Sequence, residues 1–177
     1  MTSRPAFTSP LLRLLLAGFG CLLATFPVLA QDVSEYGMKA VLFYRLPQFI
    51  YWPGGAQQPN PTVLCVAGRN PFGNALGQIE QGRGQIEVRL GVSEITACHL
   101  LFIAGSEAAN LGSWLERAHA RQIVTVSDLP GFARSGGMIE LPVDGERISI
   151  VVNRRVARRI GYEFSAQLLR LARVIEP

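Results

Sequence analysis

Short apolar runs alternate with amphipathic segments along most of the chain. The runs "TVLCVAG" (62–68) and "HLLFIAG" (99–105) are almost continuously apolar, which is the pattern of buried strands. "QIVTVSD" (122–128) is interpreted as another strand. "GQIEVRL" (84–90) instead alternates, with Ile86, Val88 and Leu90 on one side, as in a half-buried strand.

Helical spacing fills the segments between these runs. Residues 33–49 carry apolar side chains three and four positions apart, and the following prolines end the helix. A second helix follows residue 69, with Asn70 as cap and Pro71 in its first turn. A third, at 106–120, begins at Ser106 as N-cap. Its predicted inner face comprises Ala109, Leu111, Trp114, Leu115 and Ala118.

The C-terminal part predicts two strands and two helices. "GMIEL" and "RISIVV" are strands joined by a hairpin turn at Asp144-Gly145. Asn153 caps the short basic helix "RRVARRI", which Gly161 closes. Ser165 caps the last helix, whose predicted apolar stripe comprises Leu168, Leu169, Ala172 and Ile175. The order of elements predicts a single compact three-layer α/β domain, a mixed sheet with helices on both faces.

Residues 1–30 have the pattern of a cleaved signal peptide. The apolar stretch "LLRLLLAGFGCLLATFPVLA" follows Arg4, no acidic residue occurs before Asp32, and Ala30 suits a cleavage site. A transmembrane anchor is the alternative, but Arg13 and Pro27 leave less than the roughly 20 apolar residues a spanning helix needs. A lipid-modified Cys21 is a weaker alternative. We expect an exported domain at 31–177, and the resemblance described below implies that it is periplasmic.

Net charge gives no indication of nucleic-acid binding. Residues 1–30 hold two of the 17 basic residues and no acidic ones, which leaves 15 basic against 13 acidic residues in the mature chain. A net charge of +2 is too small to imply a polyanionic partner.

Two cysteines, Cys65 and Cys98, remain after cleavage of residues 1–30. In an oxidising compartment such a pair normally forms a disulfide, and this one would stabilise the fold by roughly 4 kcal/mol. A redox switch or a metal pair is the functional alternative. Because the chain has only His99 and His119 and no Cys-x-x-Cys, we expect no metal site.

The loop "SDLPGFARSGGMIEL" (127–141) is the one candidate for an active site. Ser127 could be a nucleophile, or the loop with Asp128 could bind a small ligand at a strand end. However, the sequence places no histidine near Ser127 and contains neither a nucleophile elbow nor a phosphate-binding loop. A catalytic pair of carboxylates would need two acidic residues on buried elements, but Glu87 and Glu140 are predicted on the solvent face of alternating strands. We therefore expect no enzymatic activity and no cofactor.

Exposed side chains offer candidate docking residues. Arg154, Arg155, Arg158 and Arg159 form two i, i+4 pairs on one side of their helix. This face is either simply solvated, or it binds an acidic partner or anionic headgroups. Trp52 and Phe132 lie in predicted loops, where we expect exposed anchors, although Phe132 could be tucked under its loop.

Several stretches occur together in an order that resembles the YfiR family of periplasmic proteins. They are "AVLFYRLPQFIYWP", "LCVAGRNPFG", "CHLLFI", "VSDLPGFARSGGMIEL", "ISIVVN" and "SAQLLRLARVI". The resemblance implies a compact α/β domain that tends to dimerise. It also implies a repressor that binds the periplasmic sensor domain of an inner-membrane diguanylate cyclase and lowers cyclic-di-GMP signalling.

The resemblance has three further implications. An outer-membrane lipoprotein of the peptidoglycan-associated type would sequester the protein. Cys65 and Cys98 fall in motifs that carry a stabilising disulfide, whereas the second disulfide of some members has no counterpart here. A histidine kinase or an outer-membrane receptor is the alternative partner.

Overall fold

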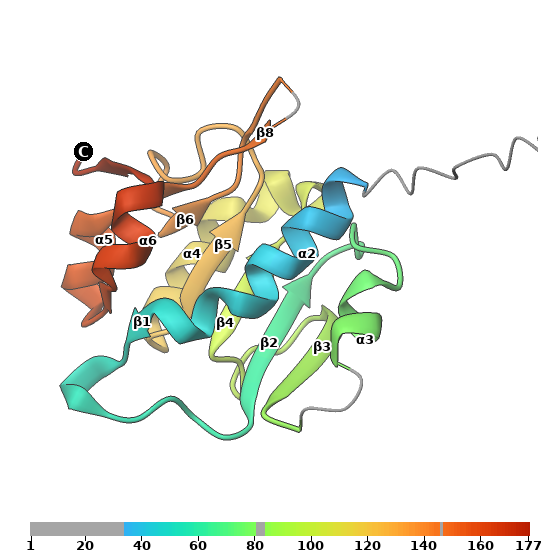
Figure 1. Cartoon of the computed structure of the whole chain (residues 1–177), viewed down its shortest axis with the longest axis horizontal. Coiled ribbons are helices and arrows are strands. Elements are labelled where there is room, and N and C mark those ends of the chain that lie inside the picture. Colours follow the sequence, from blue (N-terminus) through green and yellow to red (C-terminus); the bar gives the residue numbers. More distant parts are fainter. Residues whose placement is uncertain (1–33, 81–83, 146) are drawn as a thin grey trace, which may run out of the picture. The chain divides into compact units, whose positions relative to one another are not determined.

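Seven strands form the central sheet, in the order β11–β9–β6–β5–β4–β2–β3 (Figure 1). The computed structural model describes residues 34–80, 84–145 and 147–177, so the predicted signal peptide lies outside the described residues. Neighbouring strands are parallel except for β6 and β9. The strands are β2 (Thr62–Ala67), β3 (Ile86–Val92), β4 (Leu100–Ile103), β5 (Val124–Ser127), β6 (Ile139–Glu140), β9 (Val151–Asn153) and β11 (Arg173–Ile175).

Helices cover both faces of this sheet, which confirms the predicted three-layer α/β domain. On one face the apolar cluster contains Leu64 and Val66 of β2, together with side chains of four helices. These helices are α2 (Glu35–Arg45), α3 (Ala75–Glu80), α5 (Arg154–Ile160) and α6 (Ala166–Leu171). On the other face Val63 and Cys65 pack with α4 (Leu111–Ala120). Figure 1 shows α2 crossing the sheet in front and α4 behind it.

Side-chain caps begin α2, α5 and α6, and the caps of α5 and α6 are the predicted residues. The Ser34 hydroxyl accepts a hydrogen bond from Gly37 N at the start of α2, which continues into the 3-10 helix η1 (Leu46–Phe49). The Asn153 side chain accepts one from Val156 N in α5, and Ser165 does the same for α6. Gly161 ends α5 with a φ of 102°, the left-handed conformation that glycine adopts without strain.

Two predicted helix starts are wrong. The helix after residue 69 begins only at Ala75, because Asn70 accepts a hydrogen bond from Phe72 N and forms a turn. A 3-10 helix, η3 (Gly105–Asn110), precedes α4, and the Ser106 hydroxyl accepts a bond from Arg69 N instead of capping. The tighter turn shifts the helical phase, so that Ala109 is exposed.

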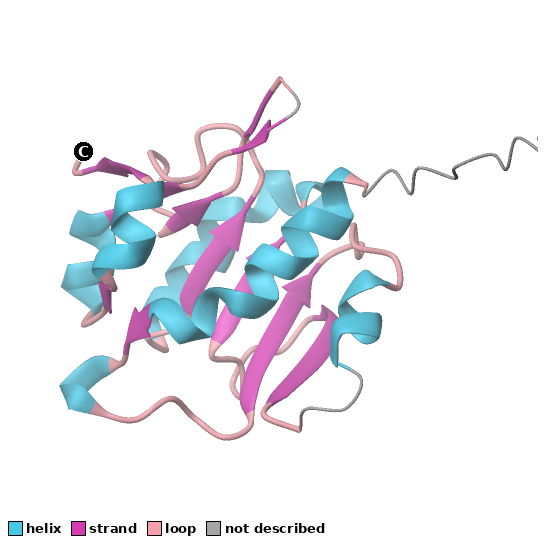
Figure 2. Cartoon of the chain, viewed as in Figure 1, coloured by secondary structure: helices cyan, strands magenta, loops and turns pink. Residues whose placement is uncertain are grey.

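The C-terminal strands are shorter and more numerous than predicted (Figure 2). β6 and β9 pair antiparallel, as the hairpin implies, but β7 (Val143–Asp144) and β8 (Arg147–Ile148) form a separate hairpin in which Asp144 pairs with Arg147. Residues 173–175 form β11 beside β9 and not the end of a helix, so Ile175 is a strand residue. β1 (Ile50–Tyr51) pairs with β10 (Glu163–Phe164), and the short 3-10 helix η2 (Pro53–Gly55) follows β1.

Candidate functional site

Ser127 ends β5 with a buried hydroxyl that is fully engaged. Its Oγ donates a hydrogen bond to the Ile103 carbonyl at 2.7 Å and accepts one from Leu129 N at 3.1 Å. A nucleophilic serine instead needs an exposed oxygen next to a general base. The hydroxyl therefore fastens the loop 128–138 to β4 and β5 and performs no nucleophilic chemistry in this arrangement.

Glu140 is buried, and its predicted position on a solvent face is wrong. Only 6% of the residue is exposed, and its two carboxylate oxygens accept hydrogen bonds from Gly131 N at 3.0 Å and Ala133 N at 2.9 Å. The loop 128–138 folds back over β6 and covers the face that strand alternation assigns to solvent. Glu140 thus holds the loop by satisfying two buried amides.

Phe132 is completely buried, so the predicted exposed anchor is wrong and the alternative of a ring tucked under the loop holds. The ring belongs to the apolar cluster on the α4 face of the sheet. A Cβ added at Gly137 would overlap it. The glycine at this position therefore allows the chain to pass directly over the ring.

Lys39 joins α2 to this loop, although the sequence alone did not single it out. Its ammonium group donates to Glu35 Oε1 at 2.5 Å and to Asp128 Oδ2 at 2.8 Å, while only 3% of its side chain is exposed. Burial lowers the pKa of Lys39, but the bonds to Asp128 and Glu35 outweigh this effect and raise the pKa above its usual value. The sequence did contain a signal for this contact, because Lys39 lies on the buried side of α2, where a lysine needs an acidic partner.

An open cavity of about 470 Å³ lies beside Lys39, at the carboxyl ends of β5 and β6. The Tyr36 ring borders it and lies 4.6 Å from the Lys39 ammonium. Burial and the hydrogen bond to Asp128 raise the pKa of Tyr36. The remaining lining residues are Glu35, Asp128, Pro130, Gly131, Glu140, Pro142 and Val143.

The strand order reverses between β2 and β4. Ligands of open α/β sheets commonly bind outside the carboxyl ends of such strands. Here the Ser106 and Glu107 side chains pack against Gly68, the residue that follows β2, so closely that a Cβ on Gly68 would overlap them.

Cys65 and Cys98 are joined in a disulfide with their Cα atoms 5.8 Å apart. The bond links β2 to the turn before β4, and both residues are buried in the cluster on the α4 face. Within residues 34–80, 84–145 and 147–177 no group of three potential ligands could hold a metal ion.

Trp52 is buried against the sheet, and its predicted exposure is wrong. Only 8% of the residue is exposed, because its indole packs edge-to-face on His99 and Tyr162 at 6.1 and 5.9 Å. Because β1 pairs with β10, Trp52, the residue after β1, lies inside the fold. The neighbouring Tyr51 is instead 62% exposed.

His99 precedes β4 and its ring accepts a hydrogen bond from the neighbouring strand. Its Nδ1 accepts a hydrogen bond from Val63 N at 2.9 Å. Burial lowers the pKa of His99, and nearby Arg89 lowers it further. The imidazole is a structural acceptor between β2 and β4, not a base near Ser127.

The α5 arginines lie on one side of the domain and are partly paired. Arg158 bonds Glu163 at 2.7 Å and approaches Glu176 at 4.0 Å, while Arg154 lies 3.7 Å from Glu163. Arg155 donates to the Glu176 carbonyl at 3.0 Å. Arg159 is exposed. A role of these side chains in partner binding stays a prediction.

No helix in the described part of the chain is long and apolar enough to span a membrane. None of the curated proteins compared with this chain matches it.

Solved structures support the fold at low identity. A conserved domain protein from Vibrio cholerae O1 biovar El Tor matches with a TM-score of 0.57 and 10% identity over 80% of this chain. The ABC domain in complex with L-Trp from Streptococcus pneumoniae matches with a TM-score of 0.50 and 12% identity over 79% of the chain. The chain spans only 60% of the length of each.

A protein-family model described as YfiR/HmsC-like matches residues 36–173. The match runs from the second residue of α2 to the first residue of β11, and it includes the disulfide and the loop 128–138. The chain therefore belongs to the YfiR/HmsC-like family, a regulatory rather than catalytic family of periplasmic proteins.

Proposed function

We propose that this protein represses an inner-membrane diguanylate cyclase by binding its periplasmic sensor domain. The observation that carries the proposal is the family match over residues 36–173. Repression then requires that the protein bind the inactive arrangement of the sensor domain more tightly than the active one. The difference between the two affinities sets how strongly cyclic-di-GMP synthesis falls.

The chemistry of the domain supports a binding role. Ser127 and Glu140 are the residues considered above for catalysis. Their polar side-chain atoms are instead hydrogen-bonded to backbone groups of the fold. Meanwhile Met38 and Val41, on the outer side of α2, are 40% and 42% exposed. Exposed apolar side chains on a helix suit docking of another protein better than catalysis.

Other parts of the proposal follow from the family. The protein works as a homodimer, and an outer-membrane lipoprotein of the peptidoglycan-associated type removes it from the cyclase. The disulfide between Cys65 and Cys98 maintains the folded population that is able to repress. No cysteine of the C-terminal half is available for a second bond.

Co-purification from the host tests the proposal. The tagged protein, isolated from the periplasm after mild cross-linking, should enrich a membrane diguanylate cyclase. Deletion of its gene should raise cellular cyclic-di-GMP, and restoring the gene should reverse the rise. Enrichment of a histidine kinase or an outer-membrane receptor, with unchanged cyclic-di-GMP, would favour the alternative partner.

Binding of a small ligand is a second candidate, favoured by the cavity beside Lys39 and Asp128. One structural neighbour was solved with L-Trp, which makes amino acids the first ligands to test. A thermal shift caused by the ligand should disappear in an Asp128→Asn variant, because Asp128 lines the cavity. A shift that survives this substitution would place the ligand elsewhere.

A further inference from the structure

Charge is divided unevenly along the domain. Residues 147–177 contain seven arginines and two glutamates, a net charge of +5. Residues 31–146 contain eight basic and eleven acidic residues, a net charge of −3. The overall value of +2 therefore hides a strongly polar distribution, which orients a protein in an electrostatic field.

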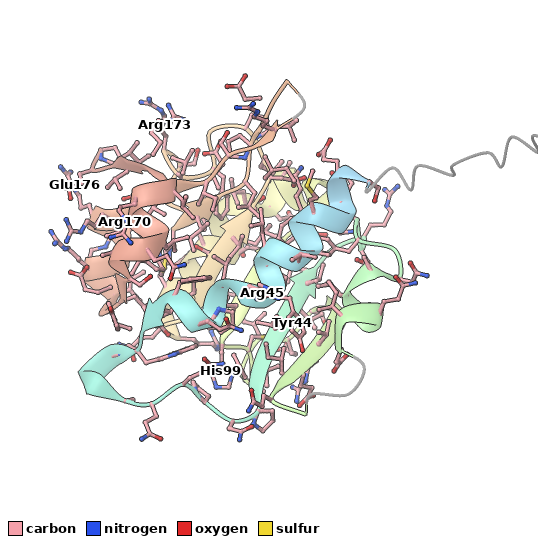
Figure 3. The ribbon with its side chains drawn as sticks, in the orientation of Figure 1. Tyr44, Arg45, His99, Arg170, Arg173 and Glu176 are labelled. Carbon is pink, nitrogen blue, oxygen red and sulfur yellow. A yellow bond between two sulfur atoms is a disulfide. The ribbon has the colours of Figure 1, made fainter. Side chains whose placement is uncertain are left out.

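The basic residues gather at one end of the fold. Of the elements in residues 147–177, α5, α6 and β11 lie together at the left of the view, whereas β8, which holds Arg147, lies at the top (Figure 1). Figure 3 shows Arg170, Arg173 and Glu176 at this outer edge, away from Arg45 on α2. We call the surface of α5, α6 and β11 the basic end.

Several of these arginines retain a free positive charge. Glu163 and Glu176 pair with Arg154 and Arg158. In the described segments, no ion pair involves Arg155, Arg159, Arg170 or Arg173. All of the basic residues at this end are arginine, whose guanidinium group is more weakly hydrated than an ammonium group and can bind phosphate in a bidentate manner.

Apolar side chains protrude between the unpaired arginines. Leu171, which lies between Arg170 and Arg173, is 73% exposed, the largest exposure among the large apolar residues described. Val174 on the edge strand β11 is 40% exposed. An exposed leucine among cations is the composition of a surface that inserts shallowly at a membrane interface.

We propose that the basic end docks on an anionic lipid surface. Arg170 and Arg173 bind headgroup phosphates, while Leu171 and Val174 lie at the boundary with the acyl chains. Each arginine contributes about a fivefold gain in partitioning at low salt. The acidic remainder of the domain then faces away from the membrane. Weak docking of this kind raises the local concentration of the protein near any membrane-anchored partner.

An acidic protein surface is the competing occupant of the basic end. A protein partner would need apolar pockets that fit Leu171 and acidic groups at fixed positions. Lipids need neither, and they satisfy scattered arginines with mobile phosphates. The high exposure of Leu171 and the spread of the arginines over α5, α6 and β11 therefore favour lipid.

Vesicle co-sedimentation of the purified mature protein tests the proposal. The protein should bind vesicles enriched in phosphatidylglycerol and not vesicles of phosphatidylcholine alone, and added salt should weaken binding. Arg170→Glu/Arg173→Glu should reduce partitioning by at least about 25-fold, the product of two such fivefold factors. Leu171→Ser should also reduce it. Arg45→Glu/Arg69→Glu, with the same charge change at two exposed positions outside the basic end, is the matched control and should have a smaller effect.

Two results would overturn the proposal. One is equal vesicle binding by the Arg170→Glu/Arg173→Glu variant and the Arg45→Glu/Arg69→Glu control, with both variants folded by circular dichroism. The other is an Arg170→Glu/Arg173→Glu variant that binds vesicles as the wild type does but no longer co-purifies an acidic protein. That result would assign the basic end to a protein partner. Cyclic-di-GMP in the deletion strain does not enter this test, so failure here is distinguishable from failure of the proposed repression.

Discussion

Lys39 holds a buried positive charge between α2 and the loop 128–138. Removing its ammonium group leaves the carboxylate of Asp128, whose side chain is only 10% exposed, without its cation. Breaking a buried pair in this way costs more than the pair contributes, because the remaining charge stays desolvated. Glu35 is 46% exposed and recovers solvation from water.

We expect Lys39→Met to lower the free energy of unfolding by about 3 kcal/mol. Lys39→Met/Asp128→Asn should recover part of this loss, since it removes the stranded charge. Glu35→Gln, at the exposed end of the same network, should cost less than about 1 kcal/mol. Urea denaturation of the three variants measures these differences. Equal losses for Lys39→Met and Glu35→Gln would contradict the account.

Gly137 and Gly112 provide a contrast between a packed and an open glycine. Gly137→Ala should cost about 1–3 kcal/mol, because its Cβ would overlap the buried ring of Phe132. Gly112 lies in α4 with nothing within 4 Å of an added Cβ. Gly112→Ala should therefore stabilise the protein by about 0.5–1 kcal/mol. Thermal unfolding measures both effects, and a loss in both variants would refute the assigned packing.

His99 makes the domain less stable in mild acid. The pKa of folded His99 is lower than the ordinary value of 6.5, so the unfolded chain binds the proton first as pH falls. Stability is then complete above about pH 6.5 and decreases as pH falls through the folded pKa. His99→Asn keeps an acceptor for Val63 N but does not titrate. Its melting temperature should fall less than that of the wild type between about pH 7.5 and about pH 5.5. An unchanged slope would show that other groups cause the acid sensitivity.

At the scale of elements, the disulfide connects β2 to the chain before β4. It closes a loop with a sequence separation of 33, for which the chain-entropy model gives roughly 4 kcal/mol. Cys65→Ala/Cys98→Ala should lose about this amount in denaturant unfolding and retain the far-ultraviolet circular dichroism of the folded domain. A loss well below about 1 kcal/mol would mean that the bond constrains little of the unfolded chain.

Local sequence signals predicted the elements they govern directly. Asn153, Gly161 and Ser165 mark helix ends through their own hydrogen bonds or conformation, and these predictions are confirmed. The short strands β10 and β11 were not predicted, because a two- or three-residue strand carries no measurable periodicity. The segment 173–175 also continues the spacing of α6, and only pairing with β9 makes it a strand.

The burial of candidate site residues could not be predicted from local pattern. Trp52, Phe132 and Glu140 were assigned to exposed positions, yet other segments of the folded chain cover all three. The Glu140 carboxylate is buried against amides of the loop 128–138, and the Trp52 indole against His99 and Tyr162. The Phe132 ring is buried in the apolar cluster on the α4 face of the sheet. The disulfide was accessible from composition, since only two cysteines follow residue 30.

At the scale of the whole molecule, the domain is a closed, well-hydrogen-bonded core with several different surfaces. The outer side of α2 exposes apolar side chains, the basic end exposes arginines, and the cavity beside Lys39 lies at the carboxyl ends of β5 and β6. A protein that works by contact needs such surfaces on a rigid scaffold. The candidate docking surface for a sensor domain is the exposed side of α2 that includes Met38 and Val41.

We expect Met38→Glu/Val41→Glu to abolish repression with little change in stability, because both side chains are already exposed. Gln78→Glu, which adds one negative charge at an exposed position on α3, is the control and should repress normally. Cyclic-di-GMP measured in complemented deletion strains reports the effect. Normal repression by the α2 variant would place the docking surface elsewhere on the domain.

The most direct test of the central claim is cyclase activity in a reconstituted membrane. The full-length diguanylate cyclase of the host is placed in vesicles with its sensor domain outward, and cyclic-di-GMP synthesis is measured while the purified protein is added outside. The account predicts a saturable fall in synthesis that the Met38→Glu/Val41→Glu variant does not produce. Undiminished synthesis at saturating protein, for every membrane cyclase of the host, would contradict it.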